Sequence, residues 1–405
     1  MNKILKNFSI YFVATIFSSL LSFVFFPIFA NVLNQENLGK LEFINSAKSL
    51  LLNLSLFGTG VYINKEYYNS DDKESLCKLV YVFTLITGFI FSIISYFVFL
   101  IAKQFPLHVI IFICVTNILE VYFSINNFII QIQERAIEYC VVNILKPLIE
   151  YVLSIIVLKF FIDTYFGRIL GNCIASFIIC LYILYRNKHL FYIKISFEQL
   201  LKMLFFGIPF VLSTIGSWII EMSDKVFISY MDDFTATAIY SVGYKMGMIV
   251  LFINTALSRV LTPFFYKNIK EHHEYVKKVL FRTTFIFALF IILYIFIAEL
   301  LLPFLFASSY LPARPVIVII AVGYFFDYLW KIVITYLISA GGTIWYNTSL
   351  VLSSLLNIIL DYVLIHYNGY LGAAYATAIS YCVGFVFCVV IYLVKYRRQY
   401  ETKSL

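Results

Sequence analysis

Apolar residues form long, nearly uninterrupted runs along this chain, and short polar segments separate the runs. A membrane-spanning helix needs about 20 consecutive, mainly apolar residues. Twelve runs reach that length. The pattern therefore predicts twelve transmembrane helices, at about residues 8–30, 41–63, 79–102, 107–131, 140–161, 166–185, 202–229, 235–262, 279–302, 313–339, 346–366 and 370–395.

Composition supports this interpretation. The 405 residues are 62% hydrophobic and 13% charged, whereas soluble globular domains carry roughly 25% charged residues. The first run is too long for the core of a signal peptide and lacks a small-residue cleavage site, so we expect it to remain as the first helix. The chain is thus predicted to be an all-α integral membrane protein.

The Lys and Arg residues are distributed unevenly between the two sides of the predicted membrane. With both termini cytoplasmic, 19 of the 30 basic residues lie on the cytoplasmic side, 5 on the other side and 6 within helices. Positive charge is retained on the cytoplasmic side, so this orientation is predicted. It also accounts for the net charge of +8, and we expect no nucleic-acid partner.

The two halves of the sequence show a weak internal repeat. Shifting by 197 residues aligns Gly39–Lys48 with Ala236–Lys245, and a shift of 207 aligns Glu120 with Asp327. Six helices per half would form two lobes related by a pseudo-twofold axis along the membrane normal. We therefore expect lobes at residues 1–197 and 198–405, with a central cavity between them.

The segment from Gly207 to Pro263 carries charges inside apolar runs, which hydrocarbon tolerates only beside a partner or a water-filled cavity. Glu221, Asp224 and Lys225 are candidates for a gating ion pair. An alternative is that Asp224 and Lys225 form a solvated pair at the outer interface. Farther along, Ser241, Lys245 and Arg259 share one face of the predicted helix 235–262.

Polar residues form a stripe along the predicted helix 107–131. A continuous polar stripe in a membrane helix faces either water or another polar stripe. The sequence leaves two functions for this stripe: it lines a cavity, or it forms hydrogen bonds between helices. The stripe consists of Asn117, Glu120, Ser124, Asn127 and Gln131, at steps of three and four residues.

Other helices carry charged residues one turn apart. Asp327 and Lys331 are spaced i,i+4, so they could form an internal ion pair, take part in transport, or both. Lys146 and Glu150 have the same spacing and could join helices. Three more polar groups, Asn45, Lys48 and Asp361, also lie within apolar runs, and both Lys48 and Lys245 could instead extend to the outer interface.

Motifs of common enzymes are absent from the sequence. There is no P-loop, no H-E-x-x-H and no G-x-S-x-G. The seven cysteines form no C-x-x-C pair, and no histidine cluster accompanies them, so neither a metal site nor another cofactor is expected.

Two stretches resemble a known family. They are "FGIPFVLSTIGSWIIEMSDKVFISYMDDFTATAIYSVGYKMGMI", with Pro209, Asp224–Lys225 and Tyr240–Ser241, and "SLLNIILDYVLIHYNGYLGAAYATAIS", with Asn357 and Gly372. They are similar to the Wzx-type O-antigen and capsule repeat-unit flippases of the multidrug/oligosaccharidyl-lipid/polysaccharide (MOP) exporter superfamily. The resemblance implies a MATE-like fold, alternating access, and movement of an undecaprenyl-diphosphate-linked oligosaccharide between leaflets of the bacterial inner membrane.

The resemblance gives the polar residues expected roles. Lys48, Lys245, Arg259 and Lys331 would attract the diphosphate or acidic sugars, whereas Glu120, Asp327 and Asp361 would couple transport to H⁺ or Na⁺. The sugar would accept or donate hydrogen bonds at Asn45, Asn117, Asn127, Tyr240 and Ser241.

Two other functions remain open from the sequence. A multidrug extruder of the same superfamily should have an acidic, apolar site, whereas the candidate cavity has about as many basic as acidic residues. A membrane polymerase or ligase acting on the same lipid carrier would need a large outer loop, and all predicted outer loops are short. A polysaccharide polymerase and a chain-length regulator are expected as partners of a flippase.

Overall fold

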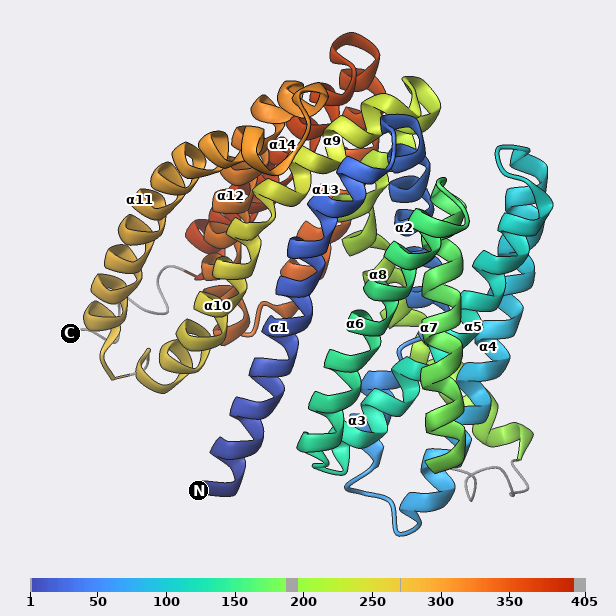
Figure 1. Ribbon diagram of the computed structural model, residues 1–405. Helices are drawn as coiled ribbons and strands as arrows, with labels where there is room; N and C mark the ends of the chain where they lie inside the picture. The colour runs from blue at the N-terminus through green and yellow to red at the C-terminus, as the bar shows by residue number, and fades with distance from the viewer. Residues whose placement is uncertain (1, 187–195, 270, 397–405) are drawn as a thin grey trace. The chain divides into compact units, whose positions relative to one another are not determined.

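The computed structural model describes residues 2–186, 196–269 and 271–396 (Figure 1). Within these ranges the chain forms fourteen α-helices, two short helices of other types and no β-strand. Ten segments of the described chain are long and apolar enough to cross a membrane, and a shorter apolar helix covers Phe17–Val32. The predicted all-α membrane fold is confirmed. Of the basic residues that predict the topology, Lys188, Lys194, Lys270, Arg397, Arg398 and Lys403 lie outside the described residues.

The chain folds into two compact units, Met1–Ile215 and Gly216–Leu405. In unit 1, α6 packs along α1 and α7, and α5 packs against α4 and α7. Its helices are α1 (Asn2–Val32), α2 (Gln35–Leu56), α3 (Thr59–Glu66), α4 (Lys73–Ala102), α5 (Leu107–Ile132), α6 (Ala136–Phe160), α7 (Tyr165–Arg186) and the first part of α8 (Phe197–Met231).

Unit 2 is built around α14, which packs on both α12 and α13, while α12 also contacts α9, α10 and α11. After the second part of α8 it contains α9 (Phe234–Gly247), α10 (Ile249–Asn268), α11 (His273–Leu305), the 3₁₀ turn η2 (Ser308–Ala313), α12 (Arg314–Ser339), α13 (Thr343–Asn368), α14 (Tyr370–Ile391) and the π-helical turn η3 (Tyr392–Tyr396).

The division between the units falls inside α8, at Ile215 and Gly216. The lobe boundary expected from the sequence, between residues 197 and 198, coincides with the start of this helix and not with the observed division. The early turns of α8 pack on unit 1, where the rings of Phe206 and Tyr62 lie 5.2 Å apart. One continuous helix is therefore shared by both units.

Two of the predicted spans are broken into shorter helices. The run at 41–63 forms α2 and α3 because Phe57 and Gly58 both adopt left-handed backbone angles, with φ of 45° and 71°. The run at 235–262 is divided at Met248 into α9 and α10. Residues on opposite sides of these breaks do not share the face of a single straight helix.

The first turns of α2 and α9 are capped in the same way. The side chain of Asn34 accepts a hydrogen bond from the backbone N–H of Asn37 at 2.8 Å. Asp233 accepts one from Ala236 at 2.6 Å. Because the first N–H groups of a helix have no partner within the helix, these caps fix where each helix begins.

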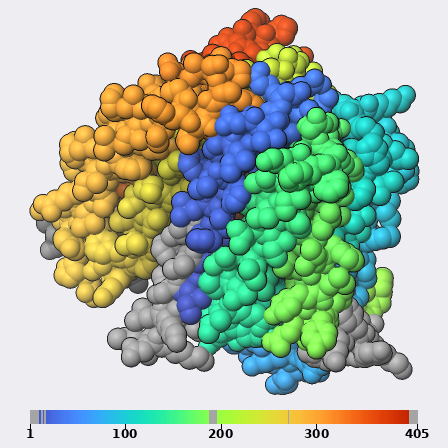
Figure 2. Space-filling model, in the orientation of Figure 1, coloured from blue at the N-terminus to red at the C-terminus, as the bar shows by residue number. Residues whose placement is uncertain are grey.

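Exposed apolar side chains cover α11, whose surface is seen in orange in Figure 2. This helix also has the highest mean hydropathy of the spanning segments in the described chain. Such a surface is stable only against an apolar medium, so α11 faces lipid. Its exposed residues include Phe281, Phe285, Ile286, Ile292, Phe296 and Phe304.

Close contact between α6 and α7 depends on Gly171. A Cβ atom at this position would lie 2.6 Å from Cα of Ser154 and 2.7 Å from its backbone N. We expect Gly171→Ala to lower the free energy of unfolding by about 1–3 kcal/mol, since backbone rather than a flexible side chain would have to move. Thermal unfolding in detergent measures this. Gly216→Ala is the control, because its Cβ would meet no atom closer than 3.6 Å; equal losses for both would contradict the prediction.

Candidate functional site

A buried network of charged and polar side chains joins four helices of unit 1. Lys48 on α2 donates a hydrogen bond to Oδ1 of Asn172 on α7, at 2.8 Å. Oε1 of Glu120 on α5 accepts hydrogen bonds from Asn172 at 3.5 Å and from Ser176 at 2.9 Å. The same oxygen lies 2.8 Å from Nζ of Lys146 on α6. One carboxylate therefore connects the two lysines.

The network continues along α6 to the start of α7. Lys146 lies 3.7 Å from Oε2 of Glu150, and Arg168 lies 2.6 Å from Oε1 of the same carboxylate. Arg168 also donates to the hydroxyl of Ser154 at 2.8 Å, and its guanidinium carbon is 5.0 Å from the ring centre of Tyr151. Both terminal nitrogens of the Arg168 guanidinium group are thus held by buried side chains of α6.

This unit 1 network contains three cations, Lys48, Lys146 and Arg168, and two carboxylates, Glu120 and Glu150. With all five ionised, it holds one excess positive charge. Lys48 stands at the end of the network, and among the described residues its hydrogen-bond partner is an amide rather than a carboxylate. Since a buried charge without a counter-charge is costly, the network favours binding of an anion at this end.

Sequence reasoning missed the part played by Arg168. The topology count includes Arg168 among the five basic residues on the side opposite the cytoplasm, but it lies in the first turn of α7, and its side chain is only 13% exposed. The i,i+4 spacing of Lys146 and Glu150 was the available signal. It indicated charge inside the membrane but could not show which residue of another helix completed the pair.

The predicted stripe on α5 serves two different purposes. Glu120 belongs to the unit 1 network, whereas Asn117 is buried and donates to Ser55 on α2 at 3.1 Å and to Ser92 on α4 at 2.9 Å. Asn127 exchanges hydrogen bonds with Asn143 on α6, at 3.1 and 3.2 Å. For these two asparagines, the structure favours hydrogen bonding between helices over lining a cavity.

Asn45 lies on the exposed side of α2 and donates to Oε1 of Glu42 at 3.2 Å. Lys48 is three residues farther along the same helix. Its bond to Asn172 holds its ammonium group within unit 1, so Lys48 does not extend to the outer interface.

Unit 2 buries two carboxyl groups together, Asp224 on α8 and Asp361 on α13. Asp224 is 1% exposed and accepts hydrogen bonds from the hydroxyl of Tyr240 and, at 2.8 Å, from the backbone N–H of Lys225. The alternative of a solvated Asp224–Lys225 pair is therefore wrong, because both side chains are buried. The ammonium group of Lys225 lies 5.1 Å from the ring centre of Tyr244.

Asp361 is fully buried, and its Oδ2 lies 3.3 Å from the hydroxyl of Ser223. Its Oδ1 has no hydrogen-bond partner within the part of the chain that the structure describes. Asn357, one turn earlier on α13, satisfies its hydrogen bonds when its amide nitrogen donates to Oδ2 of Asp361 at 3.3 Å and to the carbonyl oxygen of Ile219 at 3.1 Å. A buried carboxyl group with one unpartnered oxygen, beside a hydroxyl, suits a proton or a hard cation.

A transition metal is not indicated by this arrangement. In residues 2–186, 196–269 and 271–396, no group of three His, Cys, Asp or Glu side chains could hold a metal ion.

The predicted ion pair of Asp327 and Lys331 on α12 is present, with 2.6 Å between Nζ and Oδ2. Asn254 on α10 donates to the same oxygen at 2.7 Å. Both members of the pair line a cavity of about 140 Å³, which we call the unit 2 cavity. Its walls are formed by Ser217, Ile220, Glu221, Asp327, Trp330, Lys331, Ile334, Tyr346, Leu350 and Tyr381.

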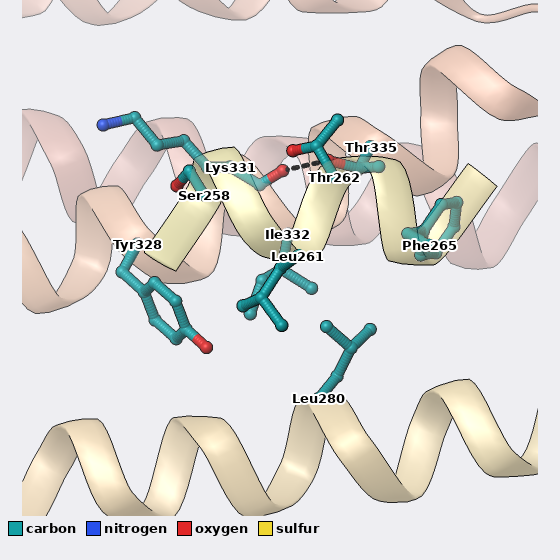
Figure 3. A pocket seen from close by; sticks show the side chains of 9 residues that line it. All are labelled: Ser258, Leu261, Thr262, Phe265, Leu280, Tyr328, Lys331, Ile332 and Thr335. Carbon is teal, nitrogen blue, oxygen red and sulfur yellow. Dashed lines mark hydrogen bonds between the residues drawn. The ribbon is translucent and has the colours of Figure 1, made fainter. Parts of the chain in front are cut away.

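A second, smaller cavity lies between α10, α11 and α12 (Figure 3). Leu261, Leu280 and Ile332 approach one another in it, while the side chain of Lys331 extends away from them. Its volume is about 20 Å³, which is enough for roughly one water molecule. It is too small for a sugar or a phosphate.

Ser241, Lys245 and Arg259, which are expected to share a face of one helix, lie on two successive helices. The break at Met248 places Lys245 on α9, where it is half-buried, and Arg259 on α10, where it is exposed. Ser241 is fully buried, and its hydroxyl has no hydrogen-bond partner among the described residues. The apolar pattern predicts one uninterrupted helix here because the run continues across Met248.

Comparison with known proteins places this chain among polysaccharide-related membrane proteins. Residues 4–269 match the family model described as polysaccharide biosynthesis protein. A protein of the Lsg locus of Haemophilus influenzae is 24% identical over 288 residues, covering 68% of this chain and 69% of that protein. An uncharacterized membrane protein of the same bacterium is 22% identical over 280 residues, covering 66% and 67%.

Solved transporters have the same fold. The lipid II flippase MurJ, in an inward closed conformation, matches with a TM-score of 0.74 and 16% identity, covering 97% of this chain and 89% of that one. An inward-facing multidrug resistance transporter of the MATE family and MOP superfamily matches with a TM-score of 0.63 and 15% identity, covering 98% and 95%. The MATE-like architecture predicted from the sequence is confirmed.

The family match extends from α1 to the end of α10 and so includes the whole unit 1 network. It covers more than half of the chain, and it agrees with the resemblance to polysaccharide exporters seen in the sequence. The chain belongs to the polysaccharide biosynthesis protein family.

Proposed function

We propose that this protein is a flippase rather than an enzyme, and that it moves an undecaprenyl-diphosphate-linked oligosaccharide repeat unit from the inner to the outer leaflet of the bacterial inner membrane. The family and the fold shared with a lipid II flippase support this proposal. The repeat unit would be one of an O-antigen or a capsule. Both termini would lie in the cytoplasm, and a polysaccharide polymerase and a chain-length regulator would act as partners.

The observation that carries the proposal is the excess positive charge of the unit 1 network. A diphosphate cannot cross hydrocarbon without a counter-charge, because an unpaired charge there costs several kcal/mol or more. Lys48 offers a cation without a carboxylate partner in the described structure. Lys146 and Arg168 add positive charge behind it, and Lys245 would contribute a further cation from α9.

We further propose that the buried oxygen groups around Asp361 take up the coupling ion, H⁺ or Na⁺. The resemblance also makes Glu120 and Asp327 candidates for this role. Each of them is held by a lysine, Glu120 by Lys146 and Asp327 by Lys331, which makes an added cation less favourable there. Asp361 has no such basic partner among the described residues, so it is the better candidate.

Replacing Lys48 and Lys245 together by alanine tests the substrate assignment. We expect this variant to fail to restore surface glycan in a bacterium that lacks its own repeat-unit flippase, because two of the cations that offset the diphosphate are removed. Surface glycan is measured with the variant and the unaltered protein present in equal amounts in the membrane.

The matched control is the double variant Lys277→Ala/Lys278→Ala, which removes two exposed lysines from the start of α11. It should restore surface glycan fully. Normal glycan with the Lys48→Ala/Lys245→Ala variant would rule out the proposed role of these lysines.

The fold is also that of a multidrug transporter, so extrusion of drugs is the second candidate function. The charge of the unit 1 network argues against it, since organic cations would be repelled by the excess positive charge. Drug susceptibility of a transporter-deficient host should not change when this protein is expressed.

A further inference from the structure

The unit 2 cavity contains a carboxyl group that forms no ion pair with another described residue. Glu221 on α8 lines the cavity, and in the described part of the chain no hydrogen bond or ion pair reaches its side chain. Asp327, on the opposite wall, is already held by Lys331 at 2.6 Å and by Asn254 at 2.7 Å. Glu221 is therefore available to accept hydrogen bonds from a ligand.

Aromatic side chains form a large part of the same walls. Trp330 and Tyr381 are both buried, with ring centres 6.3 Å apart, and Tyr346 adds a half-buried ring. The faces of aromatic rings carry partial negative charge, so they attract the polarised C–H groups of a sugar ring or an ammonium group. Aromatic rings beside free carboxylate oxygens form a surface that suits a sugar.

We propose that the unit 2 cavity binds one sugar ring of the transported head group, a ring with hydroxyl or ammonium donors and no carboxylate. The inference rests on the proposed flippase function and adds the class of sugar. Glu221 accepts hydrogen bonds from the ring, and the aromatic walls contact its apolar face. A carboxylate on the sugar is repelled by Glu221, because like charges in a partly dry site cost free energy.

The size of the cavity agrees with a single ring. Its volume of about 140 Å³ is room for roughly ten water molecules, since the centre of each water needs about 10–15 Å³. A hexose ring with its hydroxyls has about a dozen heavy atoms, a comparable number. A longer oligosaccharide would not fit, so the remaining rings of the repeat unit lie elsewhere.

The first test measures binding of four probes to the full-length protein in lipid nanodiscs: farnesyl diphosphate, and farnesyl diphosphate joined to glucosamine, glucose or glucuronic acid. We expect glucosamine and glucose to improve affinity about tenfold or more over farnesyl diphosphate alone, and glucuronic acid to give no improvement. The glucosamine probe should bind more tightly than the glucose probe, because its ammonium group contacts Glu221, and Glu221→Gln should remove this difference in affinity. Glu271→Gln, which neutralises an exposed glutamate of unit 2, is the matched control and should preserve it.

The second test measures sugar binding in the unit 2 cavity in the absence of a diphosphate. In the variant Trp218→Phe/Trp345→Phe, Trp330 is the remaining tryptophan of the three in the sequence. Methyl glucosaminide should change its fluorescence saturably, and Tyr346→Ala should weaken that response. Methyl glucuronide should leave the fluorescence unchanged.

The outcomes separate this inference from the proposed function. A lack of response of Trp330 to methyl glucosaminide, or an equal gain from glucuronic acid, overturns the inference even where farnesyl diphosphate binds. A fluorescence response together with no binding of any diphosphate probe supports the sugar site and contradicts the flippase function.

Discussion

Arg168→Leu is expected to lower the free energy of unfolding by about 3–5 kcal/mol, the usual cost of breaking a buried ion pair from one side. The arginine lies 2.6 Å from Glu150, and both side chains are 13% exposed. Removing it leaves the carboxylate with only Lys146, at 3.7 Å, and leaves the hydroxyl of Ser154 without its donor. Thermal and denaturant unfolding of the protein in detergent measures the change.

Two further variants make this prediction specific to the pair. Arg168→Leu/Glu150→Leu should recover most of the lost stability, because replacing both members of a buried pair leaves the net charge of the network unchanged. Arg186→Leu, at the other end of α7, removes an arginine that is 50% exposed and lies 3.7 Å from Glu138, so it should cost under about 1 kcal/mol. A larger loss for Arg186→Leu than for Arg168→Leu would show that burial does not determine the effect.

Asp361→Asn is expected to make transport independent of the driving ion. Coupling free energies between two sites are typically 1–3 kcal/mol, so the stimulation of flux by an ion gradient should fall by about 5–150-fold. The physical reason is that asparagine offers an amide of similar shape but no negative charge to hold H⁺ or Na⁺. The measurement is flux of a lipid-linked sugar in proteoliposomes, with a sodium gradient or a pH gradient imposed separately.

The comparison of the two gradients identifies the ion, since only the gradient that drives the unaltered protein should lose its effect. Asp163→Asn is the control, because this aspartate is exposed in the segment between α6 and α7 and should keep full stimulation. Unchanged gradient dependence in Asp361→Asn would remove this residue from the coupling mechanism and return Glu120 and Asp327 as candidates.

Much of the fold could be predicted because burial in lipid requires long apolar helices. The predicted run at 107–131, for example, is found as α5 at Leu107–Ile132. The run at 79–102 is found as α4, which begins earlier, at Lys73, where Asp72 caps the first turn. Hydropathy does not detect this polar beginning, because capping depends on one side chain and not on apolar content.

The breaks at Gly58 and Met248 could not be predicted from the apolar pattern. Both lie inside runs that are apolar on either side, and the left-handed conformation at Phe57 has no clear sequence signal. Glycine permits such a conformation but does not require it. Locating these breaks needs the packing of neighbouring helices.

The candidate site was predictable only where its members share a helix. Asp327 and Lys331 are one turn apart, so their ion pair follows from spacing alone. Lys48 and Asn172 are 124 residues apart, and Glu120 and Lys146 are 26 apart, on different helices. Such contacts depend on the rotation of each helix about its axis, which one sequence does not reveal.

Among the described residues that line the two cavities of unit 2, only Lys331 lines both. A shorter side chain at this position would enlarge both spaces in one step and would also free Asp327 from its ion pair. Size and charge at this end of α12 are thus controlled by a single residue. For engineering strains that export altered glycans, position 331 is therefore a natural first site at which to widen the range of accepted head groups.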